Sequence, residues 1–478
     1  MKRAVELFVG VTTLVAMFGI ATSAFSQESE SVSPIGVTET TVSAPPHVKA
    51  LPGTLIIPKS SLPQTPPAGH KFAANTNVRV LFPAGVTPEE APPFPGYGYE
   101  TPASLACVYG LVTTVSGCNP NSTVNDPTGG SQTVAIVDAY DNPEAAADLA
   151  WFSLQFGIPL KVSQFQVIWA NPVGSSCYGS SVPTDYSGGW EIEESLDVQW
   201  AHAMAPGATI YLVEACSNYD SDLHYGVLVA NNLVQCGNTE ISPSTGVLGT
   251  CPSGSTGKGE VSISWGGGEF AGENGSTGCA NLDDSCFTAK NVVYFASSGD
   301  GPGVIWPSAS PNVVSAGGLT TRRNPSTFNL IGQTGWVDGG GGASRIEARP
   351  SYQSGVSTVV GAFRGTPDLS ADADPYTGVY VYDTFPADGF YYYGWLIVGG
   401  TSAAAPTLAG IVNNAATRSG TFAASSNAEL TTIYANRAVT TDFTDIITAF
   451  CGPYMGFSAG TGYDFCSGVG AVKSYTGK

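Results

Sequence analysis

Thr401 and Ser402 lie where a short apolar stretch gives way to a helix-like sequence. Residues 396–398 are apolar, two glycines follow them, and three alanines follow Ser402. A strand, a sharp turn and a helix in this order would place a hydroxyl at a helix N-terminus, where free N–H groups favour negative charge on the serine oxygen. This pattern favours a serine nucleophile, but a Ser or Thr that merely caps a buried helix has the same local sequence.

A serine nucleophile needs a base, and the four histidines of the chain are poor candidates. His47 and His70 lie in a Pro-rich N-terminal region, which leaves His202 and His224. His202 lies in Ala-His-Ala-Met-Ala-Pro at the end of an amphipathic stretch and lacks a His-Gly-Thr turn. We therefore expect His202 to have a packing or capping role, so a histidine-based triad is poorly supported.

Two carboxylates offer a better base. Glu193 and Asp197 lie four residues apart in a stretch with helical spacing, so their side chains share one face. Two like charges at this spacing can share a proton, which raises one pKa and leaves a carboxylate base that works in acid. The alternative is a solvated acidic face in the first turns of a helix, where Asp and Glu are favoured.

Strand-like and helix-like segments alternate along the rest of the chain. Alternation of this kind predicts an α/β fold in which helices cover both faces of a mostly parallel sheet. Ligands bind beyond the carboxyl ends of such strands, where we expect Asp138, Trp265 and the turn at 297–300. The expected strands are 133–138, 208–213, 261–265, 292–297 and 313–316, and the expected helices are 144–156, 191–205, 220–236 and 278–290.

Charge and composition exclude some classes of partner. Of the 478 residues, 18 are Lys or Arg and 38 are Asp or Glu, which gives a net charge of −20. This balance disfavours nucleic acid and anionic membranes as partners. Only 12% of the residues are charged, while Gly numbers 59 and Pro 33, which indicates a loop-rich chain that tolerates low pH.

The N-terminus indicates export. Lys2 and Arg3 precede an apolar stretch at 7–21, and Ala-Phe-Ser at 24–26 offers a cleavage site, so residues 1–26 are predicted to be a secretory signal peptide. A retained N-terminal anchor is the alternative; no later segment is apolar for long enough to span a bilayer. Residues 27–95 are rich in Pro, Ser, Thr and Val and are expected to be mostly extended or weakly ordered, as a pro-segment or a linker. Within them only 53–57 and 78–82 resemble strands.

All ten cysteines follow the predicted signal peptide. An even number in an exported chain favours disulfides, and no Cys/His cluster indicates zinc. The connectivity does not follow from the sequence, and we predict that neighbours pair. The predicted pairs are 107–118, 177–216, 236–251, 279–286 and 451–466.

Together these motifs resemble the sedolisins, or serine-carboxyl peptidases, over about residues 96–472. The resemblance implies a subtilisin-like three-layer α/β fold with a mostly parallel central sheet, a peptidase domain at 96–478 and a short N-terminal pro-segment. The motifs that carry it are Thr-Pro-Ala-Ser-Leu at 101–105, Glu193 with Asp197 followed by Ala-Met-Ala-Pro-Gly-Ala, Ser-Ile-Ser-Trp-Gly-Gly-Gly-Glu at 262–269, Ser-Ser-Gly-Asp-Gly-Pro at 297–302 and Gly-Thr-Ser-Ala-Ala-Ala-Pro at 400–406.

The resemblance assigns roles to single residues. It implies that Ser402 is the nucleophile, Glu193 the general base and Asp197 the residue that orients Glu193. Asp300 would complete the oxyanion hole, which requires it to be protonated, because a carboxylate cannot donate a hydrogen bond. The alternative for Asp300 is a turn residue before glycine. Asp138 and Trp265 match positions that support the catalytic carboxylates through hydrogen bonds.

The resemblance also implies one structural Ca²⁺ ion near the C-terminus. Carboxylates and backbone carbonyls are hard oxygen ligands of the kind that Ca²⁺ prefers. A loop held only by the disulfide 451–466 is the alternative. The implied ligands are Asp445, Ile446, Gly460, Gly462 and Asp464.

We therefore expect a secreted, monomeric, calcium-dependent serine-carboxyl endopeptidase that hydrolyses proteins or peptides at acid pH. A tripeptidyl exopeptidase of the same family is an alternative. A non-catalytic secreted binding protein on the same scaffold is the alternative from another class.

Overall fold

The computed structural model describes residues 2–3, 53–87, 89–186, 188–236, 251, 254–279, 283–385, 394–452 and 456–478. The predicted signal peptide, apart from residues 2 and 3, and residues 27–52 of the predicted pro-segment lie outside the described residues. Among the described helices, none combines the length and apolar character that a membrane crossing needs.

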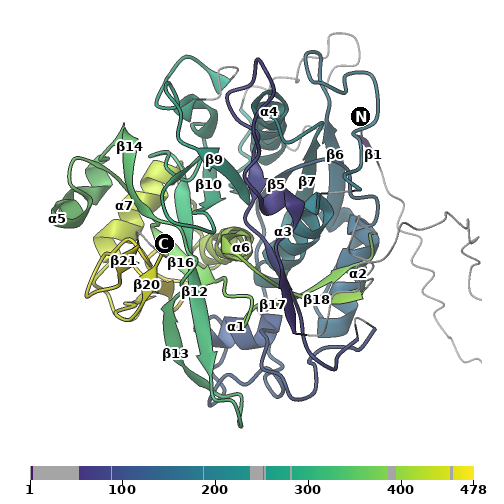
Figure 1. Cartoon of the computed structure of the whole chain (residues 1–478), viewed down its shortest axis with the longest axis vertical. Helices are drawn as coiled ribbons and strands as arrows, with labels where there is room; N and C mark the ends of the chain where they lie inside the picture. Colours follow the sequence, from purple (N-terminus) through teal and green to yellow (C-terminus); the bar gives the residue numbers. More distant parts are fainter. Residues whose placement is uncertain are drawn as a thin grey trace, which may run out of the picture.

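A large, mostly parallel sheet forms the centre of the molecule (Figure 1). Every neighbouring pair from β6 to β22 is parallel, and antiparallel strands β1, β13 and β19 lie at its margins. In spatial order the strands are β1 (Lys2–Arg3), β6 (Phe165–Ala170), β7 (Thr209–Ala215), β5 (Thr133–Ala139), β8 (Gly259–Ile263), β10 (Val292–Ser297), β12 (Val314–Arg323), β16 (Leu369–Asp372), β22 (Ala471–Val472) and β19 (Phe443–Thr444), and β13 (Leu330–Gly335) pairs with β12.

Helices cover both faces of this sheet, which confirms the predicted layers. In β5, Val134 and Ile136 pack in one apolar core with α2 (Ala145–Phe156), α3 (Trp190–Met204) and α6 (Thr401–Ser419). Ala135 and Val137 alternate with them and face a second core that contains α4 (Asp220–Cys236). Alternation along a parallel strand between two apolar cores is what a strand buried on both faces requires. The remaining helices are α1 (Pro102–Val108), α5 (Ser357–Val360) and α7 (Ser426–Asn436).

Smaller sheets frame the carboxyl ends of the central strands. An antiparallel sheet has the order β17 (Val379–Asp383), β18 (Gly394–Gly399), β4 (Arg79–Phe82) and β2 (Thr54–Ile56), and another has the order β11 (Ile305–Trp306), β9 (Trp265–Gly268) and β3 (Asn75–Thr76). Two two-stranded antiparallel sheets complete the strands: β14 (Gly342–Ala348) with β15 (Phe363–Thr366), and β20 (Phe450–Cys451) with β21 (Phe457–Ser458).

The N-terminal segment differs from the expectation of weak order. Strands β2, β3 and β4 all come from residues 53–82, and Phe72, Val80 and Leu81 are buried. The apolar side chains of this stretch, rather than its Pro-rich flanks, decide its conformation because they pack into the two cores. The part of the segment that the structure describes is therefore integrated into the fold.

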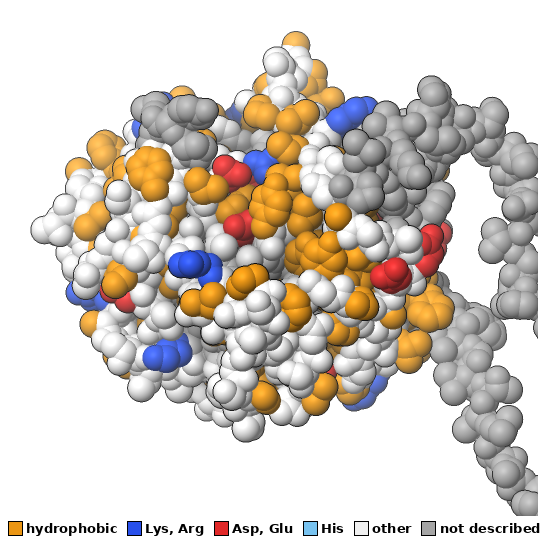
Figure 2. Space-filling model, turned by 60° about the horizontal axis from the view of Figure 1, so that its bottom comes forward, with side chains coloured by type: hydrophobic (Ala, Val, Ile, Leu, Met, Phe, Trp, Pro, Cys, Tyr) orange, Lys and Arg blue, Asp and Glu red, His pale blue; other side chains and the backbone are white. Residues whose placement is uncertain are grey.

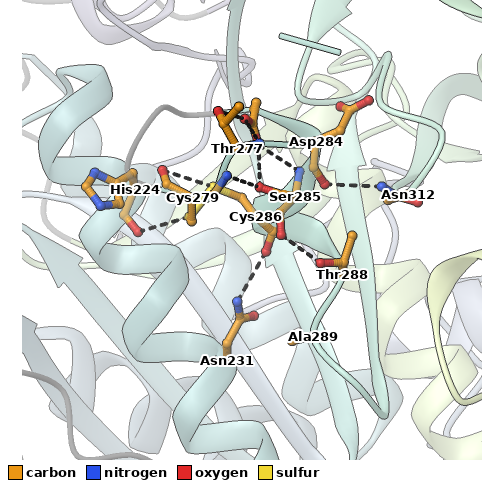
Figure 3. Close-up of a disulfide and its surroundings, with 12 residues drawn as sticks. His224, Asn231, Thr277, Cys279, Asp284, Ser285, Cys286, Thr288, Ala289 and Asn312 are labelled. Atoms are coloured by element: carbon orange, nitrogen blue, oxygen red, sulfur yellow. Dashed lines mark hydrogen bonds between the residues drawn. A yellow bond between two sulfur atoms is a disulfide. The ribbon is translucent and has the colours of Figure 1, made fainter. Parts of the chain in front are cut away.

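The predicted helix at 278–290 is wrong. The described part of this range contains the 3₁₀ helix Asp284–Phe287 instead of an α-helix, because the Asp283 side chain accepts the N–H groups of Thr277 and Ser285 and turns the chain locally. Figure 3 shows the Cys279–Cys286 disulfide beside this turn, with the Asn231 amide donating to the Cys286 carbonyl and the Asn312 amide to that of Asp284.

All five predicted disulfides are present. Lys, Arg, Asp and Glu side chains are few and scattered on the face that Figure 2 shows, as the low charged fraction predicts.

Candidate active site

The first turn of α6 and the first turns of α3 lie next to each other near the carboxyl ends of the central strands. Gly400 precedes α6 with φ +103°, a conformation that glycine adopts without strain, and places Thr401 and Ser402 at the helix N-terminus. The two helices lie side by side (Figure 1), and a Cβ on Gly410 of α6 would lie 2.8 Å from the Ala201 carbonyl oxygen and from Met204 Cβ. This close approach brings Glu193 on α3 next to Ser402.

Ser402 is fully buried and makes three hydrogen bonds near its nucleophilic oxygen. Its hydroxyl donates to the Ser264 carbonyl at 3.1 Å, and the N–H of Asn77 donates to the hydroxyl at 3.1 Å. Its own N–H donates to the carbonyl oxygen of Asn77 at 3.1 Å. The Ser264 hydroxyl in turn donates to Asp197 Oδ1 at 2.9 Å. Ser264 thus links the serine to one of the predicted carboxylates.

Glu193, Asp197 and Asp138 form a carboxyl cluster with no exposed surface. Burial raises the pKa of Glu193 well above its usual range, the Asp197 and Asp138 carboxylates raise it further, and the Ser402 hydroxyl lowers it. Burial likewise raises the pKa of Asp197, as does Asp138. No well-aligned hydrogen bond reaches either Glu193 oxygen within the described residues, although Ser402 is near enough to shift its pKa. Such bonds are often long before substrate binds, so the pair has the proximity that proton transfer needs.

Asp300 lies next to Thr401, in the turn after β10. Its Oδ1 accepts the N–H of Thr401 at 2.8 Å and the Thr401 hydroxyl at 2.9 Å, while Oδ2 has no hydrogen-bond partner among the described residues. Burial raises the pKa of Asp300 to about 7, against the lowering effect of Arg79, whose Nε lies 3.7 Å from Oδ2. Below this pH the carboxyl is neutral and can donate a hydrogen bond from its free oxygen.

The two supporting residues expected from the resemblance behave differently. Asp138 lies close enough to Glu193 and Asp197 to raise the pKa of both, and burial raises its own pKa to about 8. The Trp265 indole, however, donates to the carbonyl of Val137 at 2.7 Å rather than to a carboxylate. In this structure Trp265 therefore positions the end of β5, which carries Asp138.

Three residues at the site were not predicted. Ser264 lies in the motif at 262–269, in which only Trp265 was assigned a role. Asn77 and Arg79 lie in the presumed pro-segment, where the only signal was the strand-like run at 78–82. Long-range contacts of this kind are invisible to local periodicity, because 325 residues separate Asn77 from Ser402.

The histidines lie outside this arrangement. His202 is fully buried near the end of α3, neither ring nitrogen has a hydrogen-bond partner within the described residues, and burial lowers its pKa to about 4. His224 on α4 packs against the ring of Tyr225 at 4.2 Å. Within the described residues, neither histidine shares a hydrogen bond with Ser402.

The C-terminal loop brings Asp445 and Asp464 to one turn. Asp445 Oδ2 accepts the N–H of Gly462 and Asp464 Oδ2 that of Gly460, each at 2.9 Å. The Cys451–Cys466 disulfide closes the same loop. The described residues contain no group of three or more His, Cys, Asp or Glu side chains that could hold a metal. Carboxylates and backbone carbonyls of one loop are chemically of the all-oxygen donor type that Ca²⁺ prefers.

Comparison with known proteins gives related sequences and related solved structures. Kumamolisin from Bacillus sp. (strain MN-32) is 29% identical over 368 residues, which cover 72% of this chain and 58% of kumamolisin. Sedolisin from Pseudomonas sp. (strain 101) is 27% identical over 384 residues, which cover 75% of this chain and 60% of sedolisin. The chain thus spans about three fifths of the length of these relatives. No protein-family model matches it.

A solved structure of Pseudomonas sedolisin, a serine-carboxyl proteinase complexed with two molecules of pseudo-iodotyrostatin, has a TM-score of 0.58 to this chain. The two are 23% identical, and the match covers 79% of this chain and 96% of that one. This likeness confirms the subtilisin-like three-layer α/β fold.

Proposed function

Since the chain belongs to the sedolisin family, we propose that it is a serine-carboxyl endopeptidase that hydrolyses peptide bonds in proteins or peptides at acid pH. The observation that carries this proposal is the position of Ser402. Its hydroxyl lies at a helix N-terminus beside the buried Glu193 and Asp197, and Asp300 accepts the N–H of the adjacent Thr401.

Each catalytic group has one task in the proposed reaction. Glu193 takes the proton of Ser402 as the serine oxygen attacks the scissile carbonyl carbon, and Asp197 holds Glu193 in place. The N–H of Ser402 and a protonated Asp300 donate hydrogen bonds to the oxyanion that forms. Glu193 then gives its proton to the leaving amine, and water hydrolyses the acyl-enzyme by the same steps in reverse order.

The burial of the site supports the proposal that this form of the chain is a latent precursor. Residues 75–76 pair with β9 and residues 79–81 with β18, and burial is the largest cause of the raised pKa of Glu193. A protonated Glu193 accepts the serine proton poorly, so the closed form reacts slowly in acid until the segment is cut. We therefore propose that residues 1–26 are a signal peptide, that residues 27–95 are a pro-segment and that residues 96–478 are the peptidase domain.

The same segment favours an endopeptidase over the tripeptidyl alternative. It pairs with β9 through β3, passes Ser402 at Asn77 and pairs with β18 through β4, with more than three residues on each side of Asn77. A tripeptidyl exopeptidase needs a cleft that closes a few residues before the serine. A cleft through which a chain runs at both ends suits internal cleavage.

The C-terminal loop is proposed to bind one structural Ca²⁺ ion through Asp445, Ile446, Gly460, Gly462 and Asp464. Its two carboxylates would neutralise the ion and its glycines would let backbone carbonyls turn toward it. Five disulfides support the proposed secretion, because such bonds persist in oxidising compartments.

The test is hydrolysis of denatured casein by the processed protein and by a Ser402→Ala variant. The proposal expects loss of turnover by roughly 10⁴-fold or more in the variant, since residual catalysis then comes from binding and the oxyanion hole alone. Unchanged turnover would dismiss it and favour a non-catalytic binding protein. Peptides with blocked N-termini separate the two peptidase alternatives, because only an endopeptidase cleaves them.

A further inference from the structure

Residues 72–82 run past Ser402 as an extended peptide. On one side of Ser402, Asn75 pairs with Gly266 and Thr76 with Trp265, which makes β3 an added strand on β9. On the other side β4 pairs with β18, the strand that leads into the nucleophile. Addition of an extended strand to existing strand edges is a common mode of peptide recognition.

Asn77 is the residue of this segment that lies at Ser402. Its carbonyl oxygen accepts the N–H of Ser402 at 3.1 Å. A Cβ on Gly400 would lie 1.9 Å from this carbonyl oxygen and 2.8 Å from Asp300 Oδ2, so the two oxygens converge at one place. The Asn77 carbonyl therefore lies beside both donors that the proposed oxyanion hole provides.

The Asn77 side chain has one hydrogen-bond partner among the residues that the structure describes. Its Nδ2 donates to the Ser297 hydroxyl at 2.8 Å, and both residues are buried. Ser297 ends β10, at the carboxyl edge of the parallel sheet where ligands of such sheets bind. An amide buried without a partner costs free energy, so the hydroxyl of Ser297 favours a side chain that can hydrogen-bond at this depth.

We propose that Ser297 is a specificity residue that selects substrates with asparagine on the acyl side of the scissile bond, and that the Asn77–Val78 bond is this chain's own cleavage site. The inference rests on the proposed peptidase function. In the reaction the Ser402 oxygen bonds to the Asn77 carbonyl carbon while the bond to the Val78 nitrogen breaks. Glu193 carries the serine proton to that nitrogen, and water releases the Asn77 carboxyl group from the serine.

The test uses the full chain incubated at pH 4 with three substrates. One is a blocked peptide of the sequence Phe-Ala-Ala-Asn-Thr-Asn-Val-Arg-Val-Leu-Phe, residues 72–82 of this chain. The second carries leucine at the position of Asn77, because leucine has the branching of asparagine without its hydrogen bonds. The third is denatured casein, which reports peptidase activity without regard to Asn77.

We expect kcat/KM to be about 3- to 10-fold higher for the asparagine peptide than for the leucine peptide, the worth of one neutral hydrogen bond. Mass spectrometry should place its cleavage between asparagine and valine and find Val78 as a new N-terminus of the chain. In Ser297→Ala the ratio of the two kcat/KM values should fall toward one. A Ser262→Ala control, on the neighbouring strand β8, should keep the ratio.

Other results overturn the proposal. If casein is hydrolysed but the leucine peptide is cleaved as well as the asparagine peptide, or the cut falls at another bond, the specificity is wrong while the peptidase function stands. If neither casein nor the peptides are hydrolysed, the proposed function itself fails.

Discussion

At the scale of single residues, the site depends on two carboxyl groups in opposite protonation states. Glu193 must be ionised to accept the Ser402 proton, and Asp300 must be neutral to donate to the oxyanion. The raised pKa of Asp300, about 7 because of burial, keeps its proton through the acid range. Loss of that proton as the pH rises through 7 removes a donor and should lower the rate.

Asp300→Asn separates these effects. Asparagine donates a hydrogen bond at every pH, so the fall in kcat/KM near pH 7 should move to higher pH or vanish. Asp300→Ala has no donor and should lower kcat/KM by about 10²- to 10³-fold at all pH values. Profiles of kcat/KM from pH 3 to 9 on the processed variants measure both. An Asn variant that keeps the wild-type alkaline limb would show that Asp300 is only a turn residue.

At the scale of elements, the central strands and helices follow from the sequence because apolar runs and helical spacing report burial locally. Strand β10 has its predicted bounds, and α3 carries Glu193 and Asp197 as the spacing indicates. The conformation of the described part of residues 278–290 does not follow from the local sequence pattern, because hydrogen bonds of the Asp283 side chain turn the chain there. Ser264 and Asn77 reach the site only through tertiary pairing, which no local pattern contains.

The C-terminal loop gives a prediction at this scale. If Asp445 and Asp464 hold Ca²⁺, saturating calcium should raise the Tm, with a stabilisation of about 2.7 kcal/mol at a concentration 100-fold above Kd. Asp445→Asn keeps an oxygen that can accept the Gly462 N–H but removes the charge, so it should weaken the calcium dependence. Calorimetry with and without a chelator measures this, with the exposed Glu90→Gln as control. Equal Tm values in both conditions would leave the disulfide as the only restraint on the loop.

At the scale of the whole molecule, many carboxyl groups are buried in the fold. Burial, followed by neighbouring carboxylates, raises the pKa of Asp148 to about 8 and of Glu347 to about 9, and burial raises that of Glu273 to about 8. The folded state therefore binds more protons than the unfolded chain between about pH 4 and 8, where unfolded carboxyls are ionised. The contribution of these raised pKa values to the free energy of unfolding is fully present below pH 4 and is lost as the pH rises toward 8.

The free energy of unfolding should accordingly fall from pH 5 to pH 8. Each such group contributes up to about 1.4 kcal/mol per pH unit within its window. Urea unfolding across this range measures the slope, and Glu273→Gln, which cannot ionise, should flatten it. Stability that stays constant or rises toward pH 8 would contradict the presence of these protonated groups.

The decisive measurement is the pH dependence of kcat/KM for casein or a blocked peptide in wild type, Glu193→Gln and His202→Gln, each first processed in the same way. If a carboxylate deprotonates Ser402, wild type and His202→Gln share an acidic optimum, whereas Glu193→Gln loses at least about 10²-fold at every pH, as removal of a general base does. A neutral optimum that disappears in His202→Gln and survives in Glu193→Gln would show instead that an imidazole activates the serine.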